Sequence, residues 1–246
     1  MDRLKSPSSR PEEALFNNRW VSVIVIHYDV MQYILYPKII LEVSSVYIPK
    51  LYREEDREKI LEFLRANNFP ALVTYDGQLP IATHLPVEVR EEENGTLTIL
   101  GHMSRANPQW KGFGGAEVLL IFQGAHTYIS PRWYGHVNVP TWNYMMVHVY
   151  GKVRLVEEDE LYLLLSRFVK NHEEPVSYSL EVLPQDFVQK EMNGVVGFAV
   201  DVKRMDAGYK LSQNRNDADH ENIIRELEGR GDENSAAVAK AMKGKG

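Results

Sequence analysis

Two short turn signals between β-type runs constrain this chain more than any other feature. Asp76-Gly77 separates the runs 69–75 and 79–90, and Asn94-Gly95 separates the second run from 96–102. Asp-Gly and Asn-Gly pairs favour two-residue hairpin turns, because Gly readily adopts the positive φ angles that these turns require. The sequence therefore predicts three consecutive antiparallel strands early in the chain.

The rest of the chain is also predicted to form mainly strands, with fewer helices. Further strands are predicted at 117–123, resuming at 126–130, at 142–157 and at 194–205. Helices are predicted at 52–67, at 158–171, from about 183 and at 217–227. Because strands and helices do not alternate as in βαβ units, the pattern favours a mainly β (β+α) fold, a closed antiparallel barrel with peripheral helices. A β-sandwich is the alternative.

The composition predicts one globular domain with two extensions. A chain of 246 residues with 44% apolar residues can bury a full core. We expect the domain to span 46–228, with a partly disordered extension at 1–45 and a small, charged, Gly-rich disordered tail at 229–246. The apolar run Trp20 to Ile26 is too short to span a membrane, so no membrane association is expected.

Charge and cysteine content exclude several classes of function. The chain has no Cys, which excludes disulfides, thiolate nucleophiles and Cys-based zinc sites, and fits a reducing compartment, so we expect a cytoplasmic protein. A net charge of −6 provides no overall attraction to nucleic acid. The eight His residues lack metal-ligand spacing, so no metal site is expected.

The main candidate site is a dense polar stretch that follows the third predicted strand. It contains His102, Ser104, Arg105, Asn107 and Lys111. An Arg fork matches two phosphate oxygens, and a Ser hydroxyl adds a donor, so the stretch is suited to a phosphate monoester. The alternative interpretation is a solvated loop.

Three further segments are candidates for ligand contact. Thr83, His84 and Leu85 precede Pro86, which removes a backbone donor and so suggests a strand edge or bulge that can meet a flat heterocycle. The alternative for His84 is a histidine that flanks the core.

Trp142 begins a predicted strand and offers a ring to a ligand, although such aromatics more often anchor a core. Lys210, Gln213 and Asn214 lie in a compact polar segment that can bind an anion or an amide edge. The alternative for this last segment is a helix N-cap, supplied by Asn214 or Asn216.

Seven segments together resemble a known family. The chain contains, in order, Tyr47-Ile48-Pro49-Lys50, Ala82-Thr83-His84-Leu85-Pro86, Gly101 to Trp110, Tyr128-Ile129-Ser130-Pro131, Pro140-Thr141-Trp142-Asn143-Tyr144, Val147 to Gly151 and Lys210 to Arg215. This set resembles the PaiB family, described as FMN-binding negative transcriptional regulators, over about Val46 to Leu227. That family begins with Met where Val46 stands, so residues 1–45 lie outside it.

The resemblance implies a fold, a cofactor and an assembly. The fold is a split β-barrel of the FMN-binding type, and FMN is held between the subunits of a homodimer. Ser104 and Arg105 match the Ser-Arg pair that grips the phosphate in such folds, and Thr83, His84 and Leu85 match the strand that lines the flavin. We further expect the segment from Lys210 to Arg215 to come from the partner subunit.

Two functional hypotheses follow from this resemblance. One is an FMN-dependent oxidoreductase of unknown substrate, in which the flavin carries the redox chemistry. The other is a negative transcriptional regulator whose flavin or other small ligand controls DNA or a protein partner. The sequence shows neither a recognition-helix pattern nor a basic stripe, which argues against direct DNA contact.

Overall fold

A computed structural model describes residues 46–173 and 178–244 of the chain. The expected extension at 1–45 lies outside the described residues. The strands are β1 (Arg53–Glu54), β2 (Ala71–Tyr75), β3 (Pro80–His84), β4 (Val87–Glu91), β5 (Leu97–Ser104), β6 (Glu117–Ile129), β7 (Thr141–Leu155) and β8 (Val195–Lys210). The α-helices are α2 (Arg57–Ala66), α3 (Glu158–His172), α4 (Gln185–Met192), α5 (Asp217–Glu228) and α6 (Glu233–Lys243). Short 3-10 helices are η1 (Lys50–Tyr52), η2 (Pro108–Gly112), η3 (Pro131–Trp133) and η4 (Leu180–Val182).

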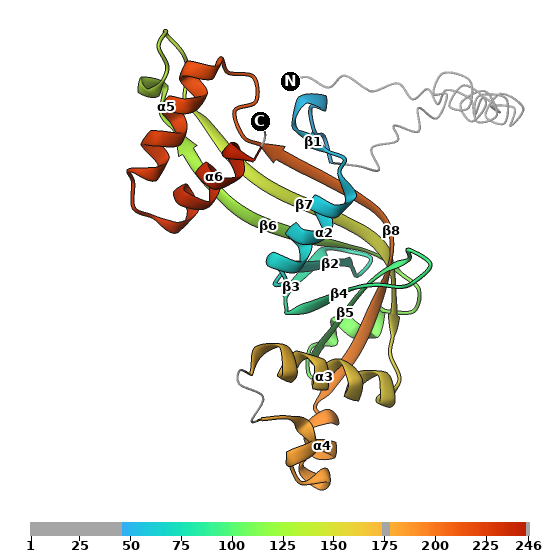
Figure 1. Ribbon diagram of the computed structural model, residues 1–246. Helices are drawn as coiled ribbons and strands as arrows, with labels where there is room; N and C mark the ends of the chain where they lie inside the picture. The colour runs from blue at the N-terminus through green and yellow to red at the C-terminus, as the bar shows by residue number, and fades with distance from the viewer. Residues whose placement is uncertain (1–45, 174–177, 245–246) are drawn as a thin grey trace, which may run out of the picture. The chain divides into compact units, whose positions relative to one another are not determined.

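The eight strands of the described residues belong to one antiparallel sheet, whose long strands β6, β7 and β8 are curved (Figure 1). The strand order is β3-β2-β6-β7-β8-β5-β4, with β1 added to β8. The two ends of this order, β3 and β4, are consecutive in the chain, so the connection at Leu85-Pro86 draws the edges of the sheet together. The predicted mainly β barrel is therefore observed, and the sandwich alternative is not.

One predicted strand is in fact two. The sequence predicts a single strand over 79–90, whereas the structure has β3 paired with β2 and β4 paired with β5. Pro86 lacks the N–H that a continuous ladder needs, so the chain changes its pairing partner at this point. The turn signals on either side are confirmed: Gly77 and Gly95 have φ angles of 96° and 80°.

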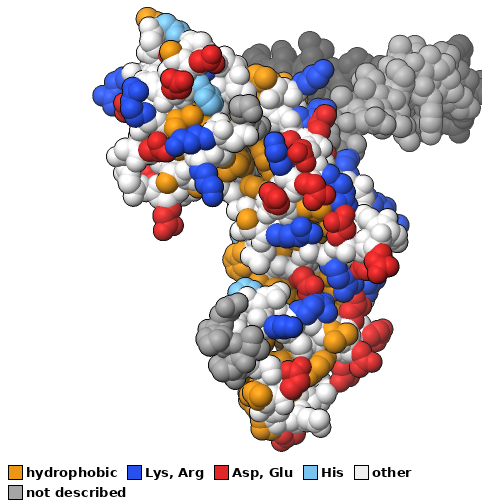
Figure 2. Space-filling model, viewed as in Figure 1, with side chains coloured by type: hydrophobic (Ala, Val, Ile, Leu, Met, Phe, Trp, Pro, Cys, Tyr) orange, Lys and Arg blue, Asp and Glu red, His pale blue; other side chains and the backbone are white. Residues whose placement is uncertain are grey.

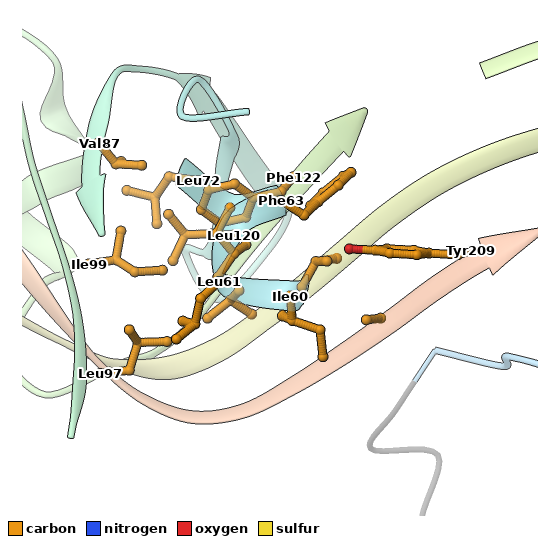
Figure 3. Close-up of a cluster of buried hydrophobic side chains, with 14 of the residues drawn as sticks. Ile60, Leu61, Phe63, Leu72, Val87, Leu97, Ile99, Leu120, Phe122 and Tyr209 are labelled. Atoms are coloured by element: carbon orange, nitrogen blue, oxygen red, sulfur yellow. The ribbon is translucent and has the colours of Figure 1, made fainter. Parts of the chain in front are cut away.

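Helix α2 fills the open side of the barrel. Asp56 caps it by accepting hydrogen bonds from the backbone N–H of Glu58 and Lys59. Figure 3 shows Leu61 and Phe63 among barrel side chains such as Leu120. The fully buried aliphatic side chains of this core each contribute about 2 kcal/mol relative to an exposed position.

Helix α3 covers a different part of the sheet, the outer face of β5 and β8. Leu164 on α3 packs with Leu100 on β5 and Ala199 on β8. Strand β5 is therefore buried on both faces, since Ile99 and Met103 point into the barrel core.

The tail is not disordered as the sequence predicts. Residues 233–243 form α6, which is capped by Asp232 and packs against α5 and β6. Val238, Ala239 and Met242 are buried in the main core cluster. These apolar residues are few and scattered among Ser, Lys and Gly, so composition alone suggests disorder, whereas their helical spacing gives the segment a buried face.

Candidate functional site

Ser104 and Arg105 lie at the end of β5, beside the start of β8. The Arg105 guanidinium donates from Nε to the Asn193 carbonyl at 2.7 Å and from Nη2 to the Val195 carbonyl at 2.9 Å. Ser104 is exposed, and its Oγ accepts a hydrogen bond from the Ala106 N–H. Arg105 is thus fixed at the surface, and among the hydrogen bonds of the described residues Nη1 has none, which leaves this nitrogen for an anion.

A buried polar network ties this loop to β3. Gln109 is only 6% exposed, and its Oε1 accepts a hydrogen bond from Thr83 Oγ1 at 2.6 Å. Its Nε2 donates to the Leu72 carbonyl and to Thr74 Oγ1. Asn107 closes the ring by donating from Nδ2 to Thr83 Oγ1 at 3.0 Å. Thr83 and Asn107 therefore use their polar groups to position the loop, and Gln109, which the sequence does not single out, holds the centre of this network.

The other residues predicted near the loop are distributed over both faces of the sheet. Leu85 is 3% exposed and belongs to the core, so its side chain serves the barrel interior. His102 points outward under α3, where its ring meets Phe168 edge-on at 5.9 Å. Burial lowers the pKa of His102 and so favours its neutral form. Lys111 is exposed in η2.

Lys210, Gln213 and Asn214 form a second group where β8 ends. Lys210 Nζ donates to Thr141 Oγ1 at 2.6 Å and lies 5.7 Å from the centre of the Tyr52 ring. Burial, together with the nearby Arg215 guanidinium, lowers the pKa of Lys210. Because Lys210 and Arg215 are neighbouring cations, an anion beside them is favoured. Gln213 hydrogen-bonds the backbone of its own turn, and Asn214 is exposed.

The two groups lie at opposite ends of the longest strand. Ser104 pairs with Val195, the first residue of β8, whereas Lys210 is the last. A strand of 16 residues extends roughly 50 Å at about 3.3 Å per residue. Figure 1 shows β8 running from the region of α3 and α4 to that of α5 and α6. One chain therefore does not bring the two groups together.

Between these ends, the outer face of the sheet carries a row of neighbouring side chains. Cross-strand pairing places His84, Ala71, Ile121, His148 and Asp206 side by side across β3, β2, β6, β7 and β8. On this face β7 also presents Tyr144, Met146 and Tyr150, all partly exposed. His84 and Trp142 are thus brought onto one face, and the Nδ1 atom of His148 is buried there without a hydrogen bond from the described residues.

A cavity of about 370 Å³ opens on this face. It is lined by Ile121, Gln123, His126, Trp142, Tyr144, Met145, Met146 and His148. Burial lowers the pKa of His148, and the neighbouring Asp206 carboxylate opposes this shift. His126 also belongs to this site, although the sequence does not predict it there, because a single His within a strand gives no distinguishing signal.

Comparison with known proteins identifies this arrangement. The solved structures that resemble the fold include the flavocytochrome Anf3 from Azotobacter vinelandii, with a TM-score of 0.53 at 14% identity over 66% of this chain and 72% of that one. A second is the FAD and heme binding protein from Mycobacterium smegmatis, with a TM-score of 0.50 at 14% identity over 65% of this chain and 73% of that one. The fold is thus that of the flavin-binding split barrels.

The sequence comparisons are more specific. Residues 46–204 match the family described as "Putative FMN-binding domain". Protein PAI 2 of Bacillus subtilis, named a protease synthase and sporulation protein, is 40% identical over 205 residues, covering 81% of this chain and 98% of that protein. An uncharacterised protein of Aspergillus fumigatus is 26% identical, covering 74% of this chain and 86% of that one. This chain belongs to the PaiB family of FMN-binding proteins, and the resemblance found in the sequence is confirmed.

The observed residues fit the cofactor of this family, FMN. The isoalloxazine is a flat, uncharged ring system with polar edges, and the cavity on the outer face is lined by aromatic, apolar and uncharged polar side chains. The phosphate needs cationic donors, and Arg105 and Lys210 each stand at an end of that face. Over the described residues there is no group of acidic and His side chains suited to a metal ion, and no helix long and apolar enough to cross a membrane.

Proposed function

We propose that this protein binds FMN between the two subunits of a homodimer. The Ser104-Arg105 end of one chain contacts the phosphate, and the Lys210, Gln213 and Asn214 end of the other chain completes the site. The observation that carries this proposal is the separation of the two groups by the full length of β8. A second chain that runs in the opposite direction across the outer face brings them together.

The outer face supports a second copy as its cover. Its half-buried aromatic and apolar side chains resemble the centre of a protein interface more than a solvated surface. A two-fold axis makes such an interface self-complementary, so one face serves both subunits. A second subunit on this face also excludes water from the cavity. It can supply a hydrogen-bond partner for His148 Nδ1, which is buried without one among the described residues.

Each group then has a defined task in the proposed site. Arg105 and Lys210 bind the anionic end, and the Thr83-Asn107-Gln109 network holds the loop that carries Arg105. Trp142 and His84 contact the ring from the sheet face. When bound, FMN supplies hydride and single-electron transfer, and we propose that the protein uses it as an oxidoreductase.

Titration with FMN tests the binding site. The full chain should quench FMN fluorescence and elute as a dimer in size-exclusion chromatography with light scattering. Arg105→Ala should raise the Kd roughly 10- to 150-fold, because a hydrogen bond to a charged group contributes about 1.5–3 kcal/mol. Arg65→Ala, which removes an exposed arginine from α2, is the matched control and should bind like the wild type. A monomeric protein with no FMN binding would contradict the proposal.

A second candidate is a regulatory role, in which bound flavin controls a partner. The specific observation in its favour is the name of the B. subtilis relative, which links that protein to protease synthesis and sporulation. Figure 2 shows Lys, Arg, Asp and Glu interspersed over the viewed face, which provides little attraction to DNA there.

A mobility-shift assay over a salt series separates direct DNA binding from other forms of regulation. We expect no shift at physiological ionic strength, with or without FMN. Tight binding whose affinity falls steeply with salt would show several phosphate contacts and would favour a DNA-binding regulator instead.

A further inference from the structure

The cavity on the outer face has a lining that selects its ligand. Among its eight residues are two histidines, a glutamine amide, a tyrosine and a tryptophan, but no Asp, Glu, Lys or Arg. Aromatic and methionine side chains favour a flat ring system, and the polar groups can meet acceptors on the edge of that ring. The cavity therefore suits an uncharged heterocycle.

A β-bulge places His126 in this cavity. Gln123 pairs with Met146 and His126 pairs with Tyr144, so three residues of β6 advance while β7 advances two. Without the bulge, the alternation of a strand would direct residue 126 to the opposite face from Gln123. With it, Gln123 and His126 share the outer face with Tyr144 and Met146, and all four line the cavity.

Trp142 then determines which ring nitrogen of His126 carries the proton. The indole Nε1 of Trp142 donates to His126 Nδ1 at 3.1 Å, and the two rings are 5.9 Å apart. An indole N–H only donates, so Nδ1 must accept, and a neutral imidazole must hold its hydrogen on Nε2. Tyr128 meets the Trp142 ring edge-on at 6.2 Å and so holds the indole in place.

We propose that His126 donates its Nε2–H to a carbonyl or ring-nitrogen acceptor on the edge of the heterocycle in this cavity, and that Trp142 is the positioning residue that fixes the required tautomer. This inference rests on the proposed function, in which the heterocycle is the isoalloxazine of FMN. The donor recognises the acceptor edge of the ring, whereas Arg105 and Lys210 recognise the phosphate.

Three variants of the full-length protein test the donor role. His126→Phe keeps a flat ring but removes the donor, and should raise the Kd for FMN about five- to tenfold, the loss of one hydrogen bond. His126→Gln retains an amide N–H and should stay within about threefold of the wild type. Trp142→Phe should fall between them. The matched control is His172→Phe, at an exposed position near the end of α3, which should leave the Kd unchanged.

Long-range nitrogen–proton NMR of histidine-labelled protein tests the tautomer directly, without FMN. Wild-type His126 should appear as the Nε2–H form, and Trp142→Phe should give a mixture of both tautomers. A mixture already present in the wild type would overturn the positioning role. Equal weakening in His126→Phe and His126→Gln would show a packing effect and overturn the donor role, as would a wild-type Kd in His126→Phe. If wild-type protein binds no FMN at all, the proposed function fails first, and the NMR result still decides the tautomer.

Discussion

Heterodimers made from Arg105→Ala and Lys210→Ala chains are expected to bind FMN, although neither variant binds it well alone. If each site takes Arg105 from one chain and Lys210 from the other, the heterodimer has one site with both mutations and one with neither. Co-expression with two different affinity tags, followed by two purification steps, isolates this species. Titration should then give about one FMN per dimer at the wild-type Kd, against two in the wild type.

The heterodimer also shows whether the proposed sharing of the site between two chains is wrong. If both groups acted on one cofactor within a chain, every site of the heterodimer would carry one mutation, and all sites would bind weakly. Each variant homodimer should have a Kd raised roughly 10- to 150-fold, since each loses a charged donor to phosphate. Thermal unfolding of both variants checks that the loss is in binding, because Arg105 also holds the carbonyls of Asn193 and Val195.

Gly151→Ala is expected to destabilise the protein by about 3 kcal/mol, at the upper end of the usual cost of overpacking. Gly151 stands where the register of β7 and β8 shifts. A Cβ atom here would lie 2.4 Å from the Asp201 carbonyl oxygen and 2.7 Å from Val200 Cγ1. Backbone cannot rotate away as a flexible side chain can, so the two central strands must separate locally. Urea unfolding followed by circular dichroism measures the loss.

Gly114→Ala is the matched control, because a Cβ at Gly114 meets no atom within 4 Å and its φ needs no glycine. It should change the free energy of unfolding by less than about 0.5 kcal/mol. Equal stability of the two variants would mean that β7 and β8 are not packed as described.

The sequence predicts the parts of the fold that are determined locally. Asp76-Gly77 and Asn94-Gly95 determine their turns by their own φ preferences, and α3 begins at Glu158 as its amphipathic pattern predicts. Two predictions, the single strand over 79–90 and the disordered tail, are wrong because contacts between distant parts of the sequence determine the structure there. The strand breaks at Leu85-Pro86 because β4 pairs with β5 and not with β2. Helix α6 is stabilised by packing against β6 and α5.

The residues of the candidate site also include some that the sequence predicts and some that it does not. The chemistry of Arg105 and Lys210 is visible in the sequence, because charged groups at strand ends are distinctive. The contribution of Gln109 is not, since its amide becomes important only when β2 and β3 fold over it. His126 is also invisible, because a single extra residue in β6 reverses the face on which it lies.

The position of β8 in the sheet affects when the barrel can fold during synthesis of the chain. β8 lies between β7 and β5 in the sheet, although it follows the other described strands in the sequence. Its pairing of Gly208 with Arg53 joins segments from near the two ends of the described chain. Contacts of such sequence separation form slowly, because a long loop must close before they stabilise anything. We therefore expect a nascent chain to lack a stable barrel until β8 has been made, and until then β5 and β7 each keep an unpaired edge.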